Sequence, residues 1–258
     1  MKLIFLGTGT STGVPQIGCT CPTCQSKDPR DKRLRCSGLL TINGVRILID
    51  CGPDFREQML RYDDFAQIDA ILITHEHYDH VGGIDDVRPY CTFGDIHIYA
   101  EDKTAQRLRE RLPYCFTEQL YPGVPHIALH HLTESEPFSV HNKAGQSISI
   151  LPLRIMHAKM PILGYRIGNL AWITDMSSLP QSSVEALKGI DTLVVNALRI
   201  EPHISHQTLE EALHFAEKIG APNTYLIHMS HQIGKHEEVE KLLPPNVHLA
   251  YDGLTIPL

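Results

Sequence analysis

The chain has 258 residues, 42% of them hydrophobic and 21% charged, which is the composition of a soluble globular protein. Lysine and arginine number 23 and aspartate and glutamate 30, so the net charge is −7, which argues against duplex nucleic acid as a partner because that needs a basic face. No apolar run approaches the ~20 residues of a membrane span, and the apolar start of the chain is shorter than the about 7–15 residues of a signal-peptide core. We therefore expect a cytoplasmic protein with no membrane partner.

The first half is predicted to alternate short strands and helices. A strand over residues 2–8 leads into a loop of small residues, 7–13, which lacks the lysine of a P-loop. Residues 27–35 are rich in lysine and arginine and predict either a solvated loop or a basic rim that faces a substrate. Asn43-Gly44 lies between two apolar runs and predicts a hairpin over residues 38–50. Further along we predict helices at 54–61, 84–90 and 103–112, strands at 69–74 and 96–99, and an irregular connection over 114–133.

The second half is predicted to repeat this style. Helix 208–219 has apolar side chains near a 3.6-residue period, and Thr208 with Glu211 forms a capping-box pattern at its start. We predict strands at 138–140, 147–156, 164–167, 171–174, 192–196 and 224–227, helices at 179–188 and 237–243, and a closing hairpin over 247–256. Hairpins outnumber simple βαβ units, so the pattern predicts an α/β protein with two mixed sheets and helices outside them.

A cluster of metal-binding side chains follows strand 69–74. His75, His77, Asp79 and His80 lie within six residues, where the chain leaves the sheet. Imidazole and carboxylate together suit zinc, iron or manganese. The helical zinc motif HExxH is excluded, because Asp79 stands where its second histidine would be. The alternative is a surface loop that happens to be rich in histidine.

Three predicted strands of the second half also end in a side chain that can bind a metal. These side chains are His157, Asp175 and His228. Alone, each has an ordinary alternative, a hydrogen-bonded surface residue. Together with the first cluster they predict a two-metal site, in which two cations about 3.5–4 Å apart share a hydroxide and hold the oxygens of an in-line displacement.

This order of ligands resembles the metallo-β-lactamase superfamily along the whole chain. The resemblance implies one domain over residues 1–258, a four-layer αββα sandwich with pseudo-halves of about 1–130 and 131–258. It implies a hydrolase with two divalent metals, manganese, zinc or iron, and it gives Asp79 the further role of orienting the attacking hydroxide. The implied ligands are His75, His77 and His157 for one metal, Asp79, His80 and His228 for the other, and Asp175 as the bridge.

The N-terminal cysteines predict a second kind of metal site. Cys19, Cys21 and Cys24 form a CxCxxC motif, and His231 is the fourth ligand that the chain offers to close a tetrahedral zinc site. The alternative is a reduced loop without metal. With the Gly-Thr-Gly-Thr strand and the late HxxHQ, this motif resembles the PhnP-type phosphodiesterases. That resemblance implies a structural zinc bracing the catalytic ligand three residues before His231, and also a homodimer.

His206 lies just before the helix capped by Thr208. The resemblance gives it a catalytic role, since PhnP-like and tRNA-processing relatives use a histidine at this position to contact the phosphate and assist the leaving group. An imidazole beside a helix N-terminus faces an anion-favouring site and can donate a proton near neutral pH. The alternative is a surface histidine, and His203 is near enough in sequence to be confused with it.

Four functions compete. The leading hypothesis is a metal-dependent phosphodiesterase that cleaves small substrates, such as cyclic phosphodiesters of ribose or nucleotides. A tRNA 3′-end endonuclease is disfavoured by the acidic net charge and by the absence of a long basic insertion. A β-lactamase or thioester hydrolase would have no use for the cysteine loop or His206. A non-catalytic carrier resembling the PqqB proteins would share the cysteine site, but loss of dinuclear ligands would favour it and none is lost.

Overall fold

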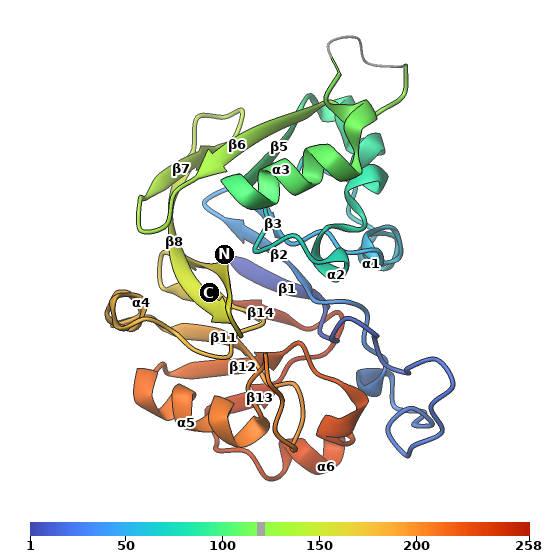
Figure 1. Ribbon diagram of the computed structural model, residues 1–258, viewed down its shortest axis with the longest axis vertical. Helices are drawn as coiled ribbons and strands as arrows, with labels where there is room; N and C mark the ends of the chain where they lie inside the picture. Colours follow the sequence, from blue (N-terminus) through green and yellow to red (C-terminus); the bar gives the residue numbers. More distant parts are fainter. Residues whose placement is uncertain (118–121) are drawn as a thin grey trace.

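The computed structural model describes residues 1–117 and 122–258 and contains two seven-stranded mixed sheets that pack face to face (Figure 1). The first sheet has the order β14-β1-β2-β3-β4-β5-β6 and the second β13-β12-β11-β10-β9-β8-β7. The strands of the first sheet are β1 (Lys2–Gly7), β2 (Ser37–Ile42), β3 (Val45–Ile49), β4 (Ala70–Leu72), β5 (Ile96–Glu101), β6 (Ile127–Leu132) and β14 (Thr255–Pro257). Those of the second are β7 (Phe138–His141), β8 (Ser147–His157), β9 (Met160–Ile167), β10 (Leu170–Ile173), β11 (Thr192–Asn196), β12 (Asn223–Ile227) and β13 (Val247–Leu249).

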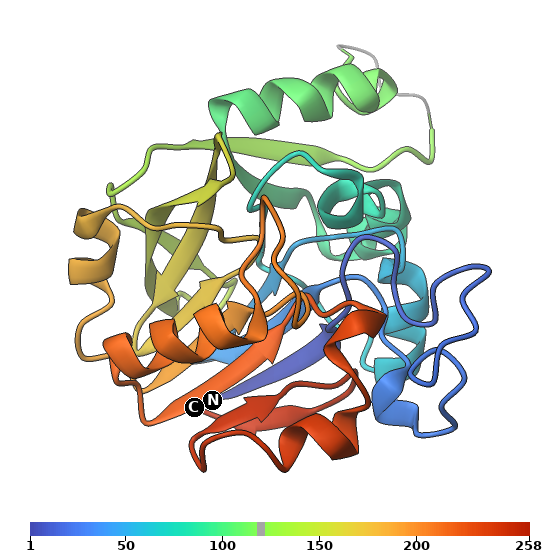
Figure 2. The same ribbon diagram turned by 60° about the horizontal axis from the view of Figure 1, so that its bottom comes forward.

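Helices cover the outer face of each sheet, as the two ribbon views show together (Figure 2). The α-helices are α1 (Phe55–Tyr62), α2 (Tyr78–Val81) and α3 (Asp102–Arg111) beside the first sheet, and α4 (Gln181–Ala186), α5 (Leu209–Ile219) and α6 (His236–Glu240) beside the second. The 3₁₀ helices are η1 (Pro29–Asp31), η2 (Ile84–Phe93), η3 (Pro113–Cys115) and η4 (His231–Ile233). This is the predicted αββα sandwich. None of the described helices is long and apolar enough to cross a membrane.

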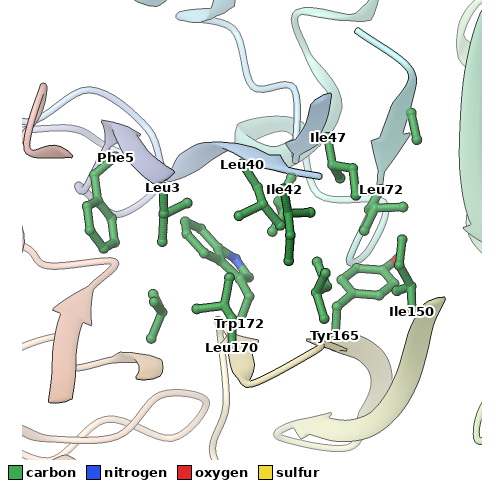
Figure 3. Packing of buried hydrophobic residues seen from close by; sticks show 14 of the residues in the cluster. Leu3, Phe5, Leu40, Ile42, Ile47, Leu72, Ile150, Tyr165, Leu170 and Trp172 are labelled. Carbon is green, nitrogen blue, oxygen red and sulfur yellow. The ribbon is translucent and has the colours of Figure 1, made fainter. Parts of the chain in front are cut away.

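A continuous apolar core lies between the two sheets (Figure 3). Phe5 and Trp172 stack across it with ring centroids 6.1 Å apart, and both side chains are fully buried. Gly38 of β2 lies against the indole, and a Cβ there would come within 2.6 Å of the ring. The absence of that methyl group lets the sheets approach closely at this point.

Three details of the prediction are wrong. The connection predicted over 114–133 contains β6, which pairs in parallel with β5; residues 118–121 of that stretch lie outside the described part of the chain. The closing hairpin does not form, because β13 pairs with β12 in the second sheet and β14 crosses to pair with β1 in the first. The helix predicted at 84–90 is the longer 3₁₀ helix η2, which accommodates Pro89.

Candidate two-metal site

The metal-binding side chains are gathered where strands of both sheets end. β4 ends at Leu72, and the chain continues through Thr74 into His75, His77 and the short helix α2, which carries Asp79 and His80. The sheets are joined at this edge, since the backbone N–H of Leu163 donates to the carbonyl of Thr74 at 3.0 Å. The cluster is therefore built on two rigid sheets that are fastened together.

The backbone turns sharply at three of these strand ends. Asp50, Asp175 and His228 all have positive φ, at 59°, 55° and 56°. This left-handed conformation costs energy in most residues and is tolerated best by short polar side chains. Backbone strain of this kind is common at functional sites. Here the left-handed conformation interrupts the alternating side-chain directions of the strand, so that each of the three side chains points toward the cluster.

The structure brings all seven predicted dinuclear ligands into overlapping groups. In each group one ligand atom per residue lies within 4.8 Å of the others. The groups are His75, His77 and His157; Asp79, His80 and His228; and His75, His80 and Asp175, which links the first two. A fourth group joins His157 and Asp175 to His206. Asp175 thus shares a group with one predicted ligand of each set, His75 and His80.

The charges in the cluster fit a bound cation. Nε2 of His80 lies 3.2 Å from both the Asp79 and Asp175 carboxylates, yet it is buried without a hydrogen-bond partner. Burial opposes charge on all three groups, but the two carboxylates and Asp50 hold the pKa of His80 well above its usual value. The pKa of Asp175 is well below its usual range because His228 and His80 outweigh the effect of burial. Two buried carboxylates are unfavourable without a nearby positive charge, and divalent metal ions can supply that charge.

Asp50 is a functional residue that the sequence reasoning missed. Its Oδ2 accepts from Nδ1 of His80 at 2.7 Å, and its other contacts are to the backbone and hydroxyl of Thr74 at 2.8–3.0 Å. Such a bond fixes the tautomer and orientation of a metal-binding imidazole. The sequence carries a signal for it, since Ile49-Asp50 is an apolar strand ending in an acid, although the hairpin predicted over residues 38–50 accounts for the same pattern.

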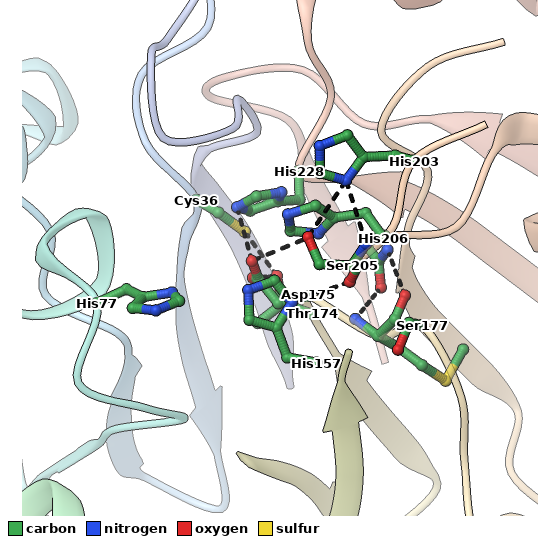
Figure 4. A network of polar contacts seen from close by, with 12 residues as sticks. Cys36, His77, His157, Thr174, Asp175, Ser177, His203, Ser205, His206 and His228 are labelled. Atoms are coloured by element: carbon green, nitrogen blue, oxygen red, sulfur yellow. Dashed lines mark hydrogen bonds and ion pairs between the residues drawn. The ribbon is translucent and has the colours of Figure 1, made fainter. Parts of the chain in front are cut away.

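His206 lies at the edge of the cluster beside His157 (Figure 4). Its Nδ1 is 3.6 Å from the Asp175 carboxylate and is buried without a hydrogen bond. Burial lowers the pKa of His206 to about 3, so the imidazole is neutral at pH 7 and able to donate one N–H. The preceding residue, Ser205, accepts from Nδ1 of His157 at 2.9 Å through its carbonyl. His203, the alternative named above, is exposed and belongs to none of these groups of ligand atoms; its ring lies against that of His206, with centroids 5.1 Å apart.

The four predicted zinc ligands also meet. Nδ1 of His231 is 3.2 Å from Sγ of Cys21 and 3.5 Å from that of Cys19, and Cys24 completes the group. The pKa of Cys21 is lowered to about 6, first by the hydrogen bond from the backbone N–H of Cys24. A Cys₃His set with one easily formed thiolate fits a tetrahedral zinc. His228 and His231 then anchor opposite ends of one short segment.

The lysine- and arginine-rich stretch at 27–35 does not form a basic rim from its arginines. Arg33 is buried and donates to the Thr8 hydroxyl and the carbonyl of Ala250. Arg30 pairs with Asp28 and Arg35 with Asp54. These guanidinium groups are used to hold the N-terminal loop in place.

Comparison with known proteins agrees with this geometry. Residues 45–229 match the family model of the beta-lactamase superfamily domain. A Porphyromonas gingivalis protein named octanoyltransferase is 46% identical over 256 residues, in a match that covers 98% of this chain and 51% of that protein. The chain therefore spans about half the length of this curated relative.

Two solved structures share the whole fold. The crystal structure of a diphosphatase from the PhnP family is 39% identical, with a TM-score of 0.90, and the match covers 100% of this chain and 97% of that one. Zinc-bound PqqB from Methylobacterium extorquens is 18% identical, with a TM-score of 0.81 and full coverage of both chains, which shows a common fold.

Proposed function

The chain belongs to the metallo-β-lactamase superfamily, and within it to the PhnP family; on that premise we propose that it is a metal-dependent phosphodiesterase of small substrates. The observation that carries the proposal is the completeness of the site. All seven side chains predicted to bind the two metals lie together, and the imidazole of His206, which makes no hydrogen bond through Nδ1, lies beside the carboxylate that would bridge the metals.

The ligands His75, His77 and His157 would hold one cation, and Asp79, His80 and His228 the other, with Asp175 shared. Two cations in these positions would lower the pKa of a shared water and neutralise charge on the phosphoryl oxygens. The Asp79 carboxylate lies beside His80 and His228, where it can accept a hydrogen bond from the attacking water and orient it. Asp50 and the Ser205 carbonyl hold two ligand imidazoles in place.

His206 is proposed as the donor to the leaving oxygen. An alkoxide leaving group needs a proton or a strong hydrogen bond as the P–O bond breaks, whereas p-nitrophenolate does not. The imidazole is neutral in the free protein, and a phosphate anion beside it would favour its protonated form. Its position 3.6 Å from Asp175, the proposed bridging ligand, would set the donor beside a phosphate held by the two metals.

The proposed substrate class depends on the substituents and charge of the phosphoryl group that the hydroxide would attack. The phosphorus of a phosphodiester bears two bridging oxygens and a single negative charge, and the same is true of each phosphorus in a diphosphate esterified at both ends. The 39% identical structure is titled a diphosphatase, so a diesterified diphosphate is the second candidate. The net charge of −7 and the engaged arginines of the N-terminal loop favour a small substrate over RNA.

Two other functions are less well supported. The relative named octanoyltransferase is about twice as long as this chain, so its activity can belong to the part that the match does not cover. A thiol that could carry an acyl group is also not accessible beside the cluster, since Cys36 is fully buried and burial raises its pKa. A carrier role of the PqqB kind needs no hydrolytic ligand set, yet the complete set is present here.

The test is turnover by manganese-loaded protein of three compounds: bis(p-nitrophenyl) phosphate, a 2′,3′-cyclic ribose phosphodiester and a dinucleoside diphosphate. Asp79→Ala should abolish all activity, and Asp95→Ala, an exposed acid elsewhere, should not. His206→Ala should slow the cyclic diester by about 10²–10⁴-fold and the p-nitrophenyl ester by less than about 10-fold. Absence of turnover of all three by fully metallated protein would refute the proposal; cleavage of the diphosphate alone would select the second candidate.

A further inference from the structure

The segment that delivers Ser205 and His206 to the site is an exposed loop, residues 199–206. Its base is closed by two backbone hydrogen bonds, from Leu198 N–H to the Gln207 carbonyl and from Leu209 N–H to the Arg199 carbonyl, both 2.9 Å long. Its tip, residues 200–205, lacks apolar packing, since Ile200 and Ile204 are 52% and 89% exposed. Something other than burial must therefore set the conformation of the tip.

One side chain supplies most of that constraint. The guanidinium of Arg199 donates from Nε to the Glu201 carbonyl at 3.0 Å and from one terminal nitrogen to the Pro202 carbonyl at 2.7 Å. The remaining described bonds to the backbone of the tip are from Ser205 N–H to His203 Nδ1 and from His157 to the Ser205 carbonyl. The second of these binds the tip to a metal ligand.

The third bond of the guanidinium reaches the zinc segment. Its other terminal nitrogen donates to Oε1 of Gln232 at 3.0 Å, and Gln232 directly follows the zinc ligand His231. The neighbouring Ser230 hydroxyl donates to the Leu198 carbonyl at 3.0 Å, so the same segment also holds the base of the loop. Hydrogen bonds and short stretches of backbone thus connect the Cys₃His group, through Gln232 and Arg199, to His157 and His206.

We infer that Arg199 is a positioning residue, which holds the loop so that His206 meets the leaving group and Ser205 orients His157. The inference rests on the proposed function. An arginine suits this task because its planar fork satisfies several carbonyls in one fixed geometry, which lysine cannot reproduce. Without the Arg199 guanidinium, the tip loses the hydrogen bonds to the Glu201 and Pro202 carbonyls and keeps only those made by Ser205. The imidazole of His206 is then no longer held against Asp175.

The experiment compares Arg199→Met with Arg166→Met in the metal-loaded protein. Arg166 is a matched control, because it also donates to three backbone carbonyls, those of Gly168, Ala186 and Lys188. Arg199→Met should raise amide hydrogen exchange in a peptide covering residues 200–206 and leave it unchanged in peptides of α5 and β11. It should slow the cyclic diester by about 10–100-fold through kcat and the p-nitrophenyl ester by less than about 3-fold. Arg166→Met should change neither the hydrogen exchange of residues 200–206 nor the ratio of the two hydrolysis rates.

Two further variants protect the test against a misfolded protein. Arg199→Lys should restore part of the cyclic-diester rate, and Gln232→Leu should produce a smaller loss that is not additive with Arg199→Met, as expected for partners in one network. Wild-type exchange and an unchanged ratio of the two rates in Arg199→Met would overturn the inference. If instead His206→Ala itself shows no preference between leaving groups, the proposed donor role fails, while the exchange data still decide whether Arg199 orders the loop.

Discussion

The carboxylate of Asp50 lies 2.7 Å from Nδ1 of His80, and both side chains are fully buried. The bond leaves Nε2 of His80 facing Asp79 and Asp175, so a residue outside the predicted ligand set fixes the orientation of one predicted ligand. Asp50 is held in turn by Thr74, on the strand exit that leads to His75 and His77. The first sheet therefore orients the imidazole before any metal binds.

Replacement of this carboxylate should weaken metal binding. Asp50→Asn replaces one acceptor oxygen by an NH2 donor, so it cannot accept from both His80 and Thr74, and we expect about 10–100-fold lower affinity for one of the two cations. Calorimetric titration of metal-depleted protein with manganese measures it. Asp69→Asn, a buried aspartate that accepts from the Arg46 backbone away from the site, is the control. Equal affinities in wild type and Asp50→Asn would show that Asp50 is only structural.

The zinc prediction can be tested by metal content. Cys21→Ser removes the thiolate nearest His231, and should cost one tightly bound equivalent of zinc and lower the melting temperature, since structural zinc contributes folding free energy directly. Cys91→Ser should retain the metal, because Cys91 is not in the cluster. Elemental analysis and thermal melts give the two readouts. A full zinc content in Cys21→Ser would disprove the site.

Asp252 should make stability depend on pH. Its carboxylate is buried, accepts from Thr8 and Leu34, and has a pKa raised by that burial to about 6. Between about pH 4, near the unfolded value, and pH 6 the folded protein keeps a proton that the unfolded chain has lost. The contribution of Asp252 to the free energy of unfolding therefore falls as pH rises through this window, by up to about 3 kcal/mol, and is constant above it.

Urea unfolding of metal-depleted wild type and Asp252→Asn from pH 4 to pH 7 isolates this effect. The free energy of unfolding of the wild type minus that of the variant should decrease as pH rises to 6. Other titrating groups are shared and cancel in the difference. A difference that stays constant, or that rises with pH, would contradict the assignment.

The contact between Gly38 and Trp172 should limit substitution at the sheet interface. Gly38→Ala places a methyl group 2.6 Å from the indole, and should destabilise the protein by about 1–3 kcal/mol with a change in tryptophan fluorescence. Trp172 is the single tryptophan, so the signal is unambiguous. In a Trp172→Leu background the same substitution should cost less, and an equal cost there would place the strain elsewhere.

The sequence was most informative where a strand pattern and a metal-binding residue coincide. Apolar runs ending in His157, Asp175 and His228 predicted three ligands from different strands, and the structure brings them together with His75 to His80. Asp50 shows the same pattern but belongs to a hairpin, and only its contact with His80 reveals its role. The sequence did not reveal how these strands pair. Histidines interrupt the apolar pattern of β6, and β13 and β14 are short strands that join different sheets, β13 beside β12 and β14 beside β1 at the other end of the chain.

The conformation of loop 199–206 could likewise not be predicted from the sequence. The resemblance to PhnP-like relatives, supported by its place before a helix, predicts His206, but the bonds from Arg199 to two carbonyls and to Gln232 depend on the fold. Such contacts carry no local pattern, because loop carbonyls are available in every sequence.

The most direct test of the two-metal account is the rate of bis(p-nitrophenyl) phosphate hydrolysis as manganese is added to metal-depleted protein whose Cys₃His group has been loaded with zinc. The account predicts little turnover with the first equivalent and full turnover only as the second is bound, with Asp175→Ala inactive at every ratio. Full turnover after a single equivalent, or none after both are bound, would contradict it.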